Sequence, residues 1–499
     1  MPNHLGEHIS DLSNEDDSAL WAERRQVVRD VVRDGWSRYR RDAWGSDEYK
    51  PISHTGHNLT SAGGVGFGIV DALDLFLMLD LKTEYEDALS WTLNELTFEL
   101  DDSYSVFETT IRVLGGLLSA YHMMGEKEPR LLHKAEDLAS RLAGAFNTDS
   151  GIPSSKINLK TRYPFLDIST NSLSEVGTLQ LEFRYLSQLT GNMTYARLVN
   201  HCMDFLAEKE PENSVYPLNI DIHSGAMFGT FLSIGARADS FYEYLLKQWL
   251  QSNGTDDRAL KMHHRSTQGI EKRLIEYTPE SNLLYVSDWD GMYSTHSMEH
   301  LACFYAGHLS LSYLYAHGEG FWRDQIRAEH DLRIGEALGE TCYQSYHRTK
   351  TGLGPDRMMF RSNDRWNDNV QNGSDPDFIF DQHDTTDRSS YRLRPETIES
   401  FFLLWRATGD NVWRERGWEV FQSILRSTKL SDGGYATVRN VDVFPPSHDD
   451  ITETFFYAET LKYLYLLFGP TDLFPLDRYV FTTEAHPLPI FTPKEGVLV

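Results

Sequence analysis

The sequence predicts an all-α protein whose helices pair into a closed toroid. About fourteen stretches repeat apolar residues at spacings of three and four, as one face of a helix requires. No comparable series of alternating β-branched residues is present, and helices joined by short turns pack as antiparallel pairs. Consecutive pairs that close on themselves give a toroid, although the spacing alone leaves closure open.

The first helix is expected over 17–44, where Trp21, Val28 and Trp36 belong to one apolar stripe. The other stretches are bounded by Gly, Asn, Asp or Pro, which are typical of helix ends. We expect them at 67–81, 85–98, 105–124, 129–146, 173–189, 194–208, 225–234, 239–252, 297–317, 329–349, 395–408, 411–427 and 451–468.

Two strand candidates and two long polar loops complete the predicted elements. The strand candidates are short and lie at 433–440 and 478–491. The polar loops lie at 147–172 and 361–393. Irregular loops of that length are usually functional or disordered.

Composition bounds the organisation of the chain and its partners. No linker rich in Pro, Gly or Ser divides it, so we expect one domain over 17–499 after a disordered polar tail over 1–16. The 499 residues, 40% of them hydrophobic, can bury a large core. The net charge of −27 would repel nucleic acid and an anionic membrane surface. No apolar run is long enough to span a membrane, and the first residues lack the apolar core of a signal peptide.

The chain has too few cysteines for a disulfide-dense scaffold, and they lack the close spacings of a zinc site. At most one bridge and one free thiol can form among Cys202, Cys303 and Cys342. Sequons for N-glycosylation, which arise by chance in a chain of this length, give only slight support to a secretory setting. They lie at Asn58, Asn192, Asn253 and Asn372.

The helix expected at 105–124 combines an apolar stripe with a charged pair. Glu108 and Arg112 lie one turn apart on a neighbouring face. Gly115 and Gly116 would let another helix approach closely. An exposed salt bridge with this spacing is common and contributes little to stability. The pair is therefore either a surface ion pair or part of a buried functional wall.

A second helix carries two carboxylates on one side. Asp239 and Glu243 lie one turn apart among apolar and aromatic residues, where like charges repel. The structural interpretation makes Asp239 a helix cap and pairs Glu243 with Lys247. The functional interpretation places both carboxylates at a binding pocket.

Acidic residues recur on two further helices. Glu396 and Glu399 follow Pro395 in a first turn, where the helix dipole favours acids and gives a sufficient structural reason for them. Glu459 follows Phe455 by one turn on a helix so apolar that the carboxylate needs a buried partner.

Carboxylates at helix starts, repeated around a toroid with aromatic residues beside them, would converge on one central cavity. Glycoside hydrolysis needs a protonated carboxylic acid at the leaving oxygen and a second carboxylate that activates water or attacks. Aromatic and polar groups then hold the sugar ring and its hydroxyls. The residues alone therefore favour an acidic, carbohydrate-cleaving pocket.

Six segments, in order along the chain, carry a family resemblance. They are VFETTIRVLGGLLSAY, GARADSFYEYLLKQW, MEHLACF, LRPETIESFF, FFYAETLKYLYLLF and FTTEAHPLPI. They resemble the signatures of class I α-1,2-mannosidases, glycoside hydrolase family 47, and are nearest to its endoplasmic-reticulum branch, which trims high-mannose N-glycans. The resemblance covers residues 20–492 and implies an (αα)7 barrel of seven helix pairs, plugged by a β-hairpin within 478–491. It also implies a calcium-dependent, inverting hydrolase.

The resemblance implies catalytic roles for three carboxylates. Glu396 matches the general base that activates water. Glu108 and Asp239 match the two carboxylates from which the general acid is drawn, and Glu108, acting through a bound water, is the favoured one. In an inverting enzyme the acid and the base stand roughly 6.5 to 9.5 Å apart to admit the attacking water.

The resemblance also implies a calcium site. Thr483 matches the residue that ligates Ca²⁺ directly, through its hydroxyl and carbonyl oxygens. Calcium takes about six to eight oxygen ligands, so water and sugar hydroxyls would supply the rest. The carboxylates of the outer shell, which would hold those waters, match Asp71, Glu243, Glu399, Glu459 and Glu484.

A set of substrate-binding residues follows from the same matches. Phe455 would face the sugar ring, and Asp356 stands where the family usually has Glu, which alters a glycan or water contact. Arg112, Arg394 and His300 would orient carboxylates or hydroxyls, and a structural core histidine is an equal interpretation of His300. The expected set is Arg112, Glu243, His300, Asp356, Arg394, Glu399, Phe455 and Glu459.

Cys303 and Cys342 match the family's disulfide and leave Cys202 as a buried thiol, which favours an oxidising lumen. We expect a monomer that removes terminal α-1,2-linked mannose from high-mannose N-glycans in the endoplasmic-reticulum lumen, or after secretion. The family's usual amino-terminal membrane anchor is missing from this sequence.

The alternative from another class is a quality-control factor, like the degradation-enhancing relatives, that binds the glycan without turnover. The presence of all three catalytic carboxylates speaks against it. Other rivals are a different helical-barrel glycosidase and an isoprenoid-processing barrel. The latter needs Asp-rich magnesium motifs, and the sequence has no convincing one.

Overall fold

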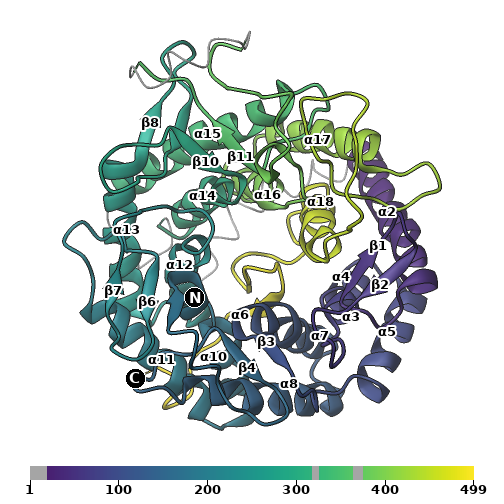
Figure 1. Ribbon diagram of the computed structural model, residues 1–499, viewed down its shortest axis with the longest axis vertical. Helices are drawn as coiled ribbons and strands as arrows, with labels where there is room; N and C mark the ends of the chain where they lie inside the picture. Colours follow the sequence, from purple (N-terminus) through teal and green to yellow (C-terminus); the bar gives the residue numbers. More distant parts are fainter. Residues whose placement is uncertain (1–18, 317–324, 364–374, 499) are drawn as a thin grey trace.

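The computed structural model describes residues 19–316, 325–363 and 375–498. Their helices form two concentric rings around a central axis (Figure 1). The tail expected over 1–16 lies outside the described residues, as do parts of the helix expected at 297–317 and of the loop expected at 361–393.

Helices of the inner ring are buried on nearly every side, which explains why their sequences are apolar all round. They are α3 (Phe67–Val70) with α4 (Leu73–Met78); α6 (Val106–Glu108), η1 (Thr109–Leu114) and α7 (Gly115–Met123); α9 (Leu173–Gly177) with α10 (Gln180–Thr190); α12 (Asp239–Gln251); η3 (His300–Cys303) with α14 (Phe304–Ala316); α16 (Glu396–Thr408); and η6 (Phe456–Leu461) with α18 (Lys462–Leu467).

Helices of the outer ring bury one face and expose the other. They are α2 (Ala19–Asp42), α5 (Lys82–Asn94), α8 (Pro129–Leu142) followed by η2 (Ala143–Phe146), α11 (Thr194–Glu208), α13 (Asp257–Leu274), α15 (Gln325–His347) and α17 (Val412–Thr428). Each inner unit packs against the outer helix that follows it, and α18 packs against α2, so that the described residues form seven pairs.

A buried ion pair joins the two ends of the inner ring. Lys462 of α18 lies 2.8 Å from Asp74 of α4, and both side chains are fully buried. On the next inner unit, Gly116 of α7 lies so close to α3 that an added Cβ would stand 2.5 Å from the Val70 carbonyl oxygen. The ring is therefore closed by direct contact between helices from opposite ends of the chain.

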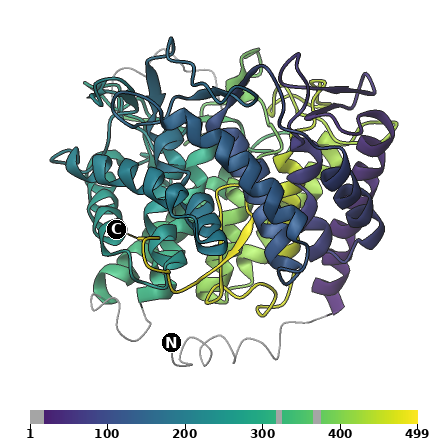
Figure 2. The same cartoon turned by 90° about the horizontal axis from the view of Figure 1, so that it is seen from below.

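Short antiparallel strands form within the connections from outer to inner helices, at the upper end of the barrel in Figure 2. They are β1 (Glu48–Lys50), β2 (Thr55–His57), β3 (Ser103–Ser105), β4 (Lys156–Asn158), β5 (Thr170–Ser172), β6 (Asn219–Asp221), β7 (Met227–Phe228), β8 (Ile275–Tyr277), β9 (Leu284–Val286), β10 (Ser297–Glu299) and β11 (Arg357–Met359), with the 3₁₀ turn η5 at Asp387–Ser389.

The C-terminal hairpin enters the ring from the other end, as the yellow ribbon in Figures 1 and 2 shows. Its strands are β12 (Tyr479–Phe481) and β13 (Pro487–Pro489), with Phe481 opposite Pro487. Strand β12 packs against α12 and β13 against α7. The hairpin expected within 478–491 is thus confirmed, and its turn at 482–486 points into the barrel.

Two expected elements are wrong. Residues 225–234 form β7 and an irregular loop instead of a helix, because Met227 pairs with β6 and Gly229 has a φ of +98°. Residues 433–440 make only isolated bridges, from Tyr435 and Val438, instead of a strand.

Helix α13 and strands β4 and β5 were not expected. The buried face of α13 carries polar residues such as His263, Ser266 and Thr267, which hide its periodicity. The two strands lie inside the polar loop expected at 147–172. None of the helices in the described ranges has the length and apolar character to span a membrane.

Candidate active site

A cavity of about 470 Å³ opens where the inner helices begin, and the turn of the C-terminal hairpin contributes to its lining. All three expected catalytic carboxylates line it, together with most of the expected sugar and calcium contacts. The lining residues named from the sequence are Glu108, Arg112, Asp239, Glu243, Arg394, Glu396, Glu399, Phe455, Glu459, Thr483 and Glu484.

Helix starts place these carboxylates at the cavity. Glu108 ends the first turn of α6, which is capped by the Ser105 hydroxyl through the Glu108 amide. Asp239 and Glu396 are the first residues of α12 and α16. Helix N-termini carry partial positive charge, so their convergence stabilises negative groups in the cavity.

Arg112 links Glu108 to the hairpin turn. Its Nε donates to Glu108 over 2.9 Å, and its Nη1 contacts Glu484 and donates to Thr454 over 3.0 Å. Its guanidinium also lies 5.6 Å from the ring centre of Phe455. The pair therefore forms the ion pair that its spacing suggested, and this ion pair lies in the cavity wall with the Glu108 side chain partly exposed.

Asp239 lies among neutral donors and other acids. Its Oδ1 accepts hydrogen bonds from Ser174 Oγ (2.8 Å) and the Ser240 amide (2.7 Å). Burial raises the pKa of Asp239 to about 7; the charges of Glu243 and Glu299 add to this rise, and the two hydrogen bonds oppose it. Asp239 thus holds a proton near neutral pH, as a general acid must.

Glu243 keeps the partner that its spacing suggested. It forms an ion pair with Lys247, one turn further along α12. The cap at the start of that helix is Ala238, so the expected cap role of Asp239 is wrong.

Glu396 has the opposite environment to Asp239. Its Oε2 lies 2.6 Å from His300 Nδ1, and its Oε1 lies 3.8 Å from Arg394 Nη1. Burial favours the protonated form, but the hydrogen bond from His300 and the charges of His300 and Arg394 outweigh it and lower the pKa of Glu396. Glu396 is therefore ionised at neutral pH, as a base must be.

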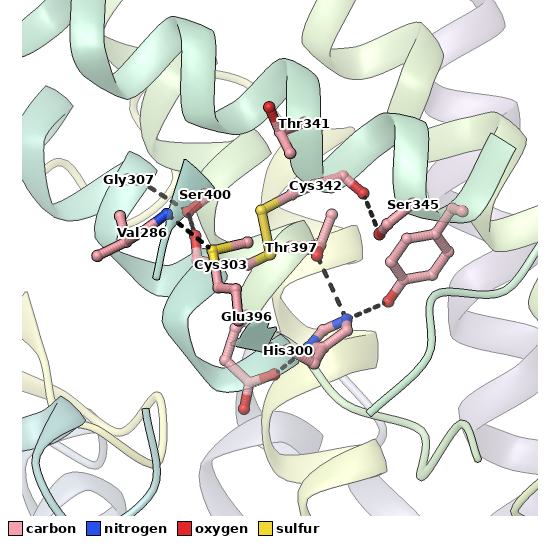
Figure 3. Close-up of a disulfide and its surroundings, with 12 residues drawn as sticks. Val286, His300, Cys303, Gly307, Thr341, Cys342, Ser345, Glu396, Thr397 and Ser400 are labelled. Carbon is pink, nitrogen blue, oxygen red and sulfur yellow. Dashed lines mark hydrogen bonds and ion pairs between the residues drawn. A yellow bond between two sulfur atoms is a disulfide. The ribbon is translucent and has the colours of Figure 1, made fainter. Parts of the chain in front are cut away.

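His300 is fully buried behind Glu396 and fixes its position, as Figure 3 shows. Its Nε2 lies 2.6 Å from the hydroxyl of Tyr346 on α15. Its amide donates to the Asp356 carbonyl over 2.9 Å, and the Asp356 carboxylate in turn pairs with Arg394. His300 and Asp356 thus lie behind the lining and support it.

The Cys303–Cys342 disulfide lies beside this support (Figure 3). It joins η3, which carries His300, to α15, which carries Tyr346. The disulfide and the free buried thiol of Cys202 both agree with expectation.

Acidic side chains crowd the base of the cavity with few cations among them. Lys247 lies 3.7 Å from Glu399 and is shared with Glu243. Burial raises the pKa of Glu399 to about 8 despite Lys247, and the charges of Glu243 and Glu396 add to the rise. Burial and neighbouring acids also raise the pKa values of Glu459 and Glu484.

This crowd of acids fits a cation, because a divalent ion would offset charges that the protein leaves uncompensated. No set of three or more His, Cys, Asp or Glu side chains within the described ranges is grouped to ligate a metal. Asp71 lies behind the lining, 3.5 Å from Arg112, and accepts a hydrogen bond from Thr454.

Several lining residues were missed from the sequence. Ser172, Ser174 and Glu175 line the cavity beside Arg237. Ser172 and Glu175 form a capping box at α9, a pattern that the sequence SLSE displays. Arg237 lies within the GARADS segment but has no spacing signal of its own.

Comparison with known proteins identifies the family of this chain. The family model described as glycosyl hydrolase family 47 matches residues 31–490. The mouse mannosyl-oligosaccharide 1,2-alpha-mannosidase IB is 38% identical over 95% of this chain and 71% of the relative. The human endoplasmic reticulum mannosyl-oligosaccharide 1,2-alpha-mannosidase is 40% identical over 94% of this chain and 64% of the relative.

A solved structure shows the same architecture. The α-1,2-mannosidase from Trichoderma reesei matches with a TM-score of 0.83 at 26% identity, covering 94% of this chain and 99% of that chain. The expected (αα)7 barrel is thereby confirmed. Because the family model matches most of the chain, this protein belongs to glycosyl hydrolase family 47.

Proposed function

We propose that this chain hydrolyses terminal α-1,2-linked mannose from high-mannose N-glycans with inversion at the anomeric carbon. The observation that carries the proposal is that Asp239 and Glu396 line one cavity and have opposite environments, which raise the pKa of Asp239 and lower that of Glu396. Relatives that match over nearly the whole chain are named mannosyl-oligosaccharide 1,2-alpha-mannosidases.

In this mechanism Glu396 accepts a proton from a water molecule, whose oxygen attacks the anomeric carbon. The bond from that carbon to the leaving oxygen breaks, and the acid supplies the proton that the leaving oxygen takes up. His300, hydrogen-bonded to Glu396 and held by Tyr346, fixes the direction in which the base faces.

Asp239 is the carboxyl that we propose as the source of the donated proton, because its pKa is raised to about 7. Glu108, which the family resemblance favours as the acid, accepts a charge-assisted hydrogen bond from Arg112. Glu108 acting through bound water is the alternative.

Calcium is the cofactor that we propose for the bottom of the cavity. When bound, the ion would supply a positive centre that orients sugar hydroxyls and water. Thr483 would hold it directly, and the surrounding acids, Glu243, Glu399, Glu459 and Glu484 with Asp71 behind them, would hold its waters.

We further propose that residues 17–499 act as one catalytic domain, as a monomer, in the secretory pathway and chiefly in the endoplasmic-reticulum lumen. A single chain carries all the candidate residues, which supports a monomer. The disulfide suits an oxidising compartment, and the relatives include an endoplasmic reticulum enzyme.

Substitution Glu396→Gln tests the base. We expect it to lower kcat at least about a hundredfold while high-mannose glycan still binds, because the amide cannot accept the proton but keeps the size of the side chain. Release of mannose and glycan binding are measured in parallel, with Glu415→Gln on the outer surface as the matched control. Near-wild-type kcat in Glu396→Gln would rule out this base, and binding without mannose release by the wild type would favour the quality-control alternative.

The pH profile of kcat/KM tests the acid. We expect kcat/KM to fall as the pH rises through about 7, because Asp239 must keep its proton. The acidic limb should lie below the ordinary carboxyl range of about 4.3, because the pKa of Glu396 is lowered. The Glu108→Gln variant should retain some activity, and its kcat/KM should still fall as the pH rises through about 7. A profile that is flat from pH 6 to 9 would exclude Asp239 as the donor.

Substitution Thr483→Ala tests the calcium site. We expect calcium to bind at least about tenfold more weakly and to raise the Tm less than in the wild type, because two-state stability follows ligand affinity. Calorimetric titration of chelator-treated protein measures both, and Thr408→Ala, at the end of α16, is the control. Unchanged calcium affinity in Thr483→Ala would place the ion elsewhere.

A further inference from the structure

The hairpin turn that carries Thr483 contains a disfavoured backbone conformation and a buried carboxylate. Its residues 482–486 have Ala485 in the left-handed region at a φ of +55°, where a Cβ is disfavoured. Glu484 in the same turn is buried and contacts the Arg112 guanidinium. The turn is closed by hydrogen bonds between Thr482, Ala485 and His486, and groups outside the hairpin also bond to it.

Lys462 holds the turn from α18. Its ammonium donates to the Ala485 carbonyl over 2.9 Å and lies 2.8 Å from Asp74 Oδ1. Lys462 and Asp74 are both fully buried. One cation thus ties the strained residue of the turn to the two helices that close the inner ring.

His486 extends the same contact toward α7. Its ring nitrogens lie 2.8 Å from Asp74 and 3.2 Å from Asp71. A Cβ on Gly115 would stand 2.8 Å from the His486 ring, so this glycine leaves the space that the ring occupies. Ser119, one turn along α7, donates to Asp74 over 2.9 Å.

Tyr244 holds the turn from the opposite side, on α12. Its hydroxyl accepts a hydrogen bond from the Thr483 amide over 3.3 Å and donates to Glu182 over 2.7 Å. Tyr244 is fully buried and does not belong to the cavity lining. It therefore bonds the backbone of Thr483 from outside the cavity.

We propose that Lys462 and Tyr244 are positioning residues that fix the Thr483 turn for the calcium ion. The inference rests on the proposed calcium function. Its physical basis is preorganisation: a turn already held in its binding geometry needs no reordering when the ion arrives, so its affinity is higher. Neither residue touches the cavity, so each acts through the turn.

Two tyrosines on α12 offer a matched comparison. Tyr242 is as buried as Tyr244, and its hydroxyl also accepts a backbone amide hydrogen, that of Tyr216, over 3.0 Å. Tyr242→Phe and Tyr244→Phe each remove one hydrogen bond from a backbone amide, but only the bond to Tyr244 reaches the hairpin. Tyr244→Phe also removes the hydrogen bond to Glu182. Calorimetric calcium titration of the chelator-treated protein, with the Tm of the calcium-free form, is the experiment.

We expect Tyr244→Phe to weaken calcium binding about fivefold, the effect of one hydrogen bond, while Tyr242→Phe keeps the wild-type Kd. Both should lower the calcium-free Tm. Equal Kd values in the two variants would overturn the proposal, because Tyr244 would then act on stability alone. If the wild type binds no calcium, the proposed calcium site itself is wrong. If the wild type binds calcium and neither substitution changes the Kd, only the positioning role is wrong.

A second pair tests Lys462. Lys462→Met removes the charge and keeps the length of the side chain. Arg184→Met removes another buried cation, which lies 2.9 Å from Asp256 and does not contact the hairpin. We expect Lys462→Met to weaken calcium binding at least about tenfold, because a charged hydrogen bond contributes more than a neutral one. Arg184→Met should keep the Kd at a comparable loss of Tm. If Lys462→Met does not fold, the tyrosine pair decides the question.

Discussion

The crowding of buried carboxylates around one hairpin turn is the constraint on which the rest of the structure depends. Glu243, Glu399, Glu459 and Glu484 come from α12, α16, η6 and the hairpin, so no single element brings them together. Like charges in a site of low dielectric repel strongly. The barrel therefore has to hold these elements in place by packing and by the few cations that it supplies.

Those cations lie where elements meet. Lys247 forms ion pairs with Glu243 and Glu399, and Arg112 forms ion pairs with Glu108 and Glu484. Lys462 forms an ion pair with Asp74 where the inner ring closes. Burial, with the charges of neighbouring acids, raises the pKa values of Glu399, Glu459 and Glu484. A bound divalent cation would relieve this charge, and the same arrangement leaves Asp239 protonated and Glu396 ionised.

Sequence reasoning succeeds for the elements whose signal is local. Inner helices such as α12 and α16 are rich in apolar residues, so their positions could be predicted, and the quoted segments carried the candidate carboxylates. Helix α13 was missed because its buried face mixes polar residues such as His263 and Ser266 with apolar ones. The spacing of Glu108 and Arg112 fits both a surface pair and a cavity wall, and the contact from Arg112 to Glu484 that decides between them spans the chain.

Long-range partners are what the sequence could not reveal. Tyr346 against His300, Tyr244 against Thr483 and Lys462 against Ala485 each join two different elements, which are 46, 239 and 23 residues apart in the sequence. No periodicity marks such residues, because each looks like an ordinary member of a buried helix.

The stereochemistry of the first product tests the central claim, that water activated by Glu396 attacks while a protonated carboxyl releases the sugar. Proton NMR of early hydrolysis of an α-1,2-linked mannose substrate shows the anomer before mutarotation. A single displacement predicts β-mannose as the first product. α-Mannose as the first product would mean a covalent intermediate and would contradict this account.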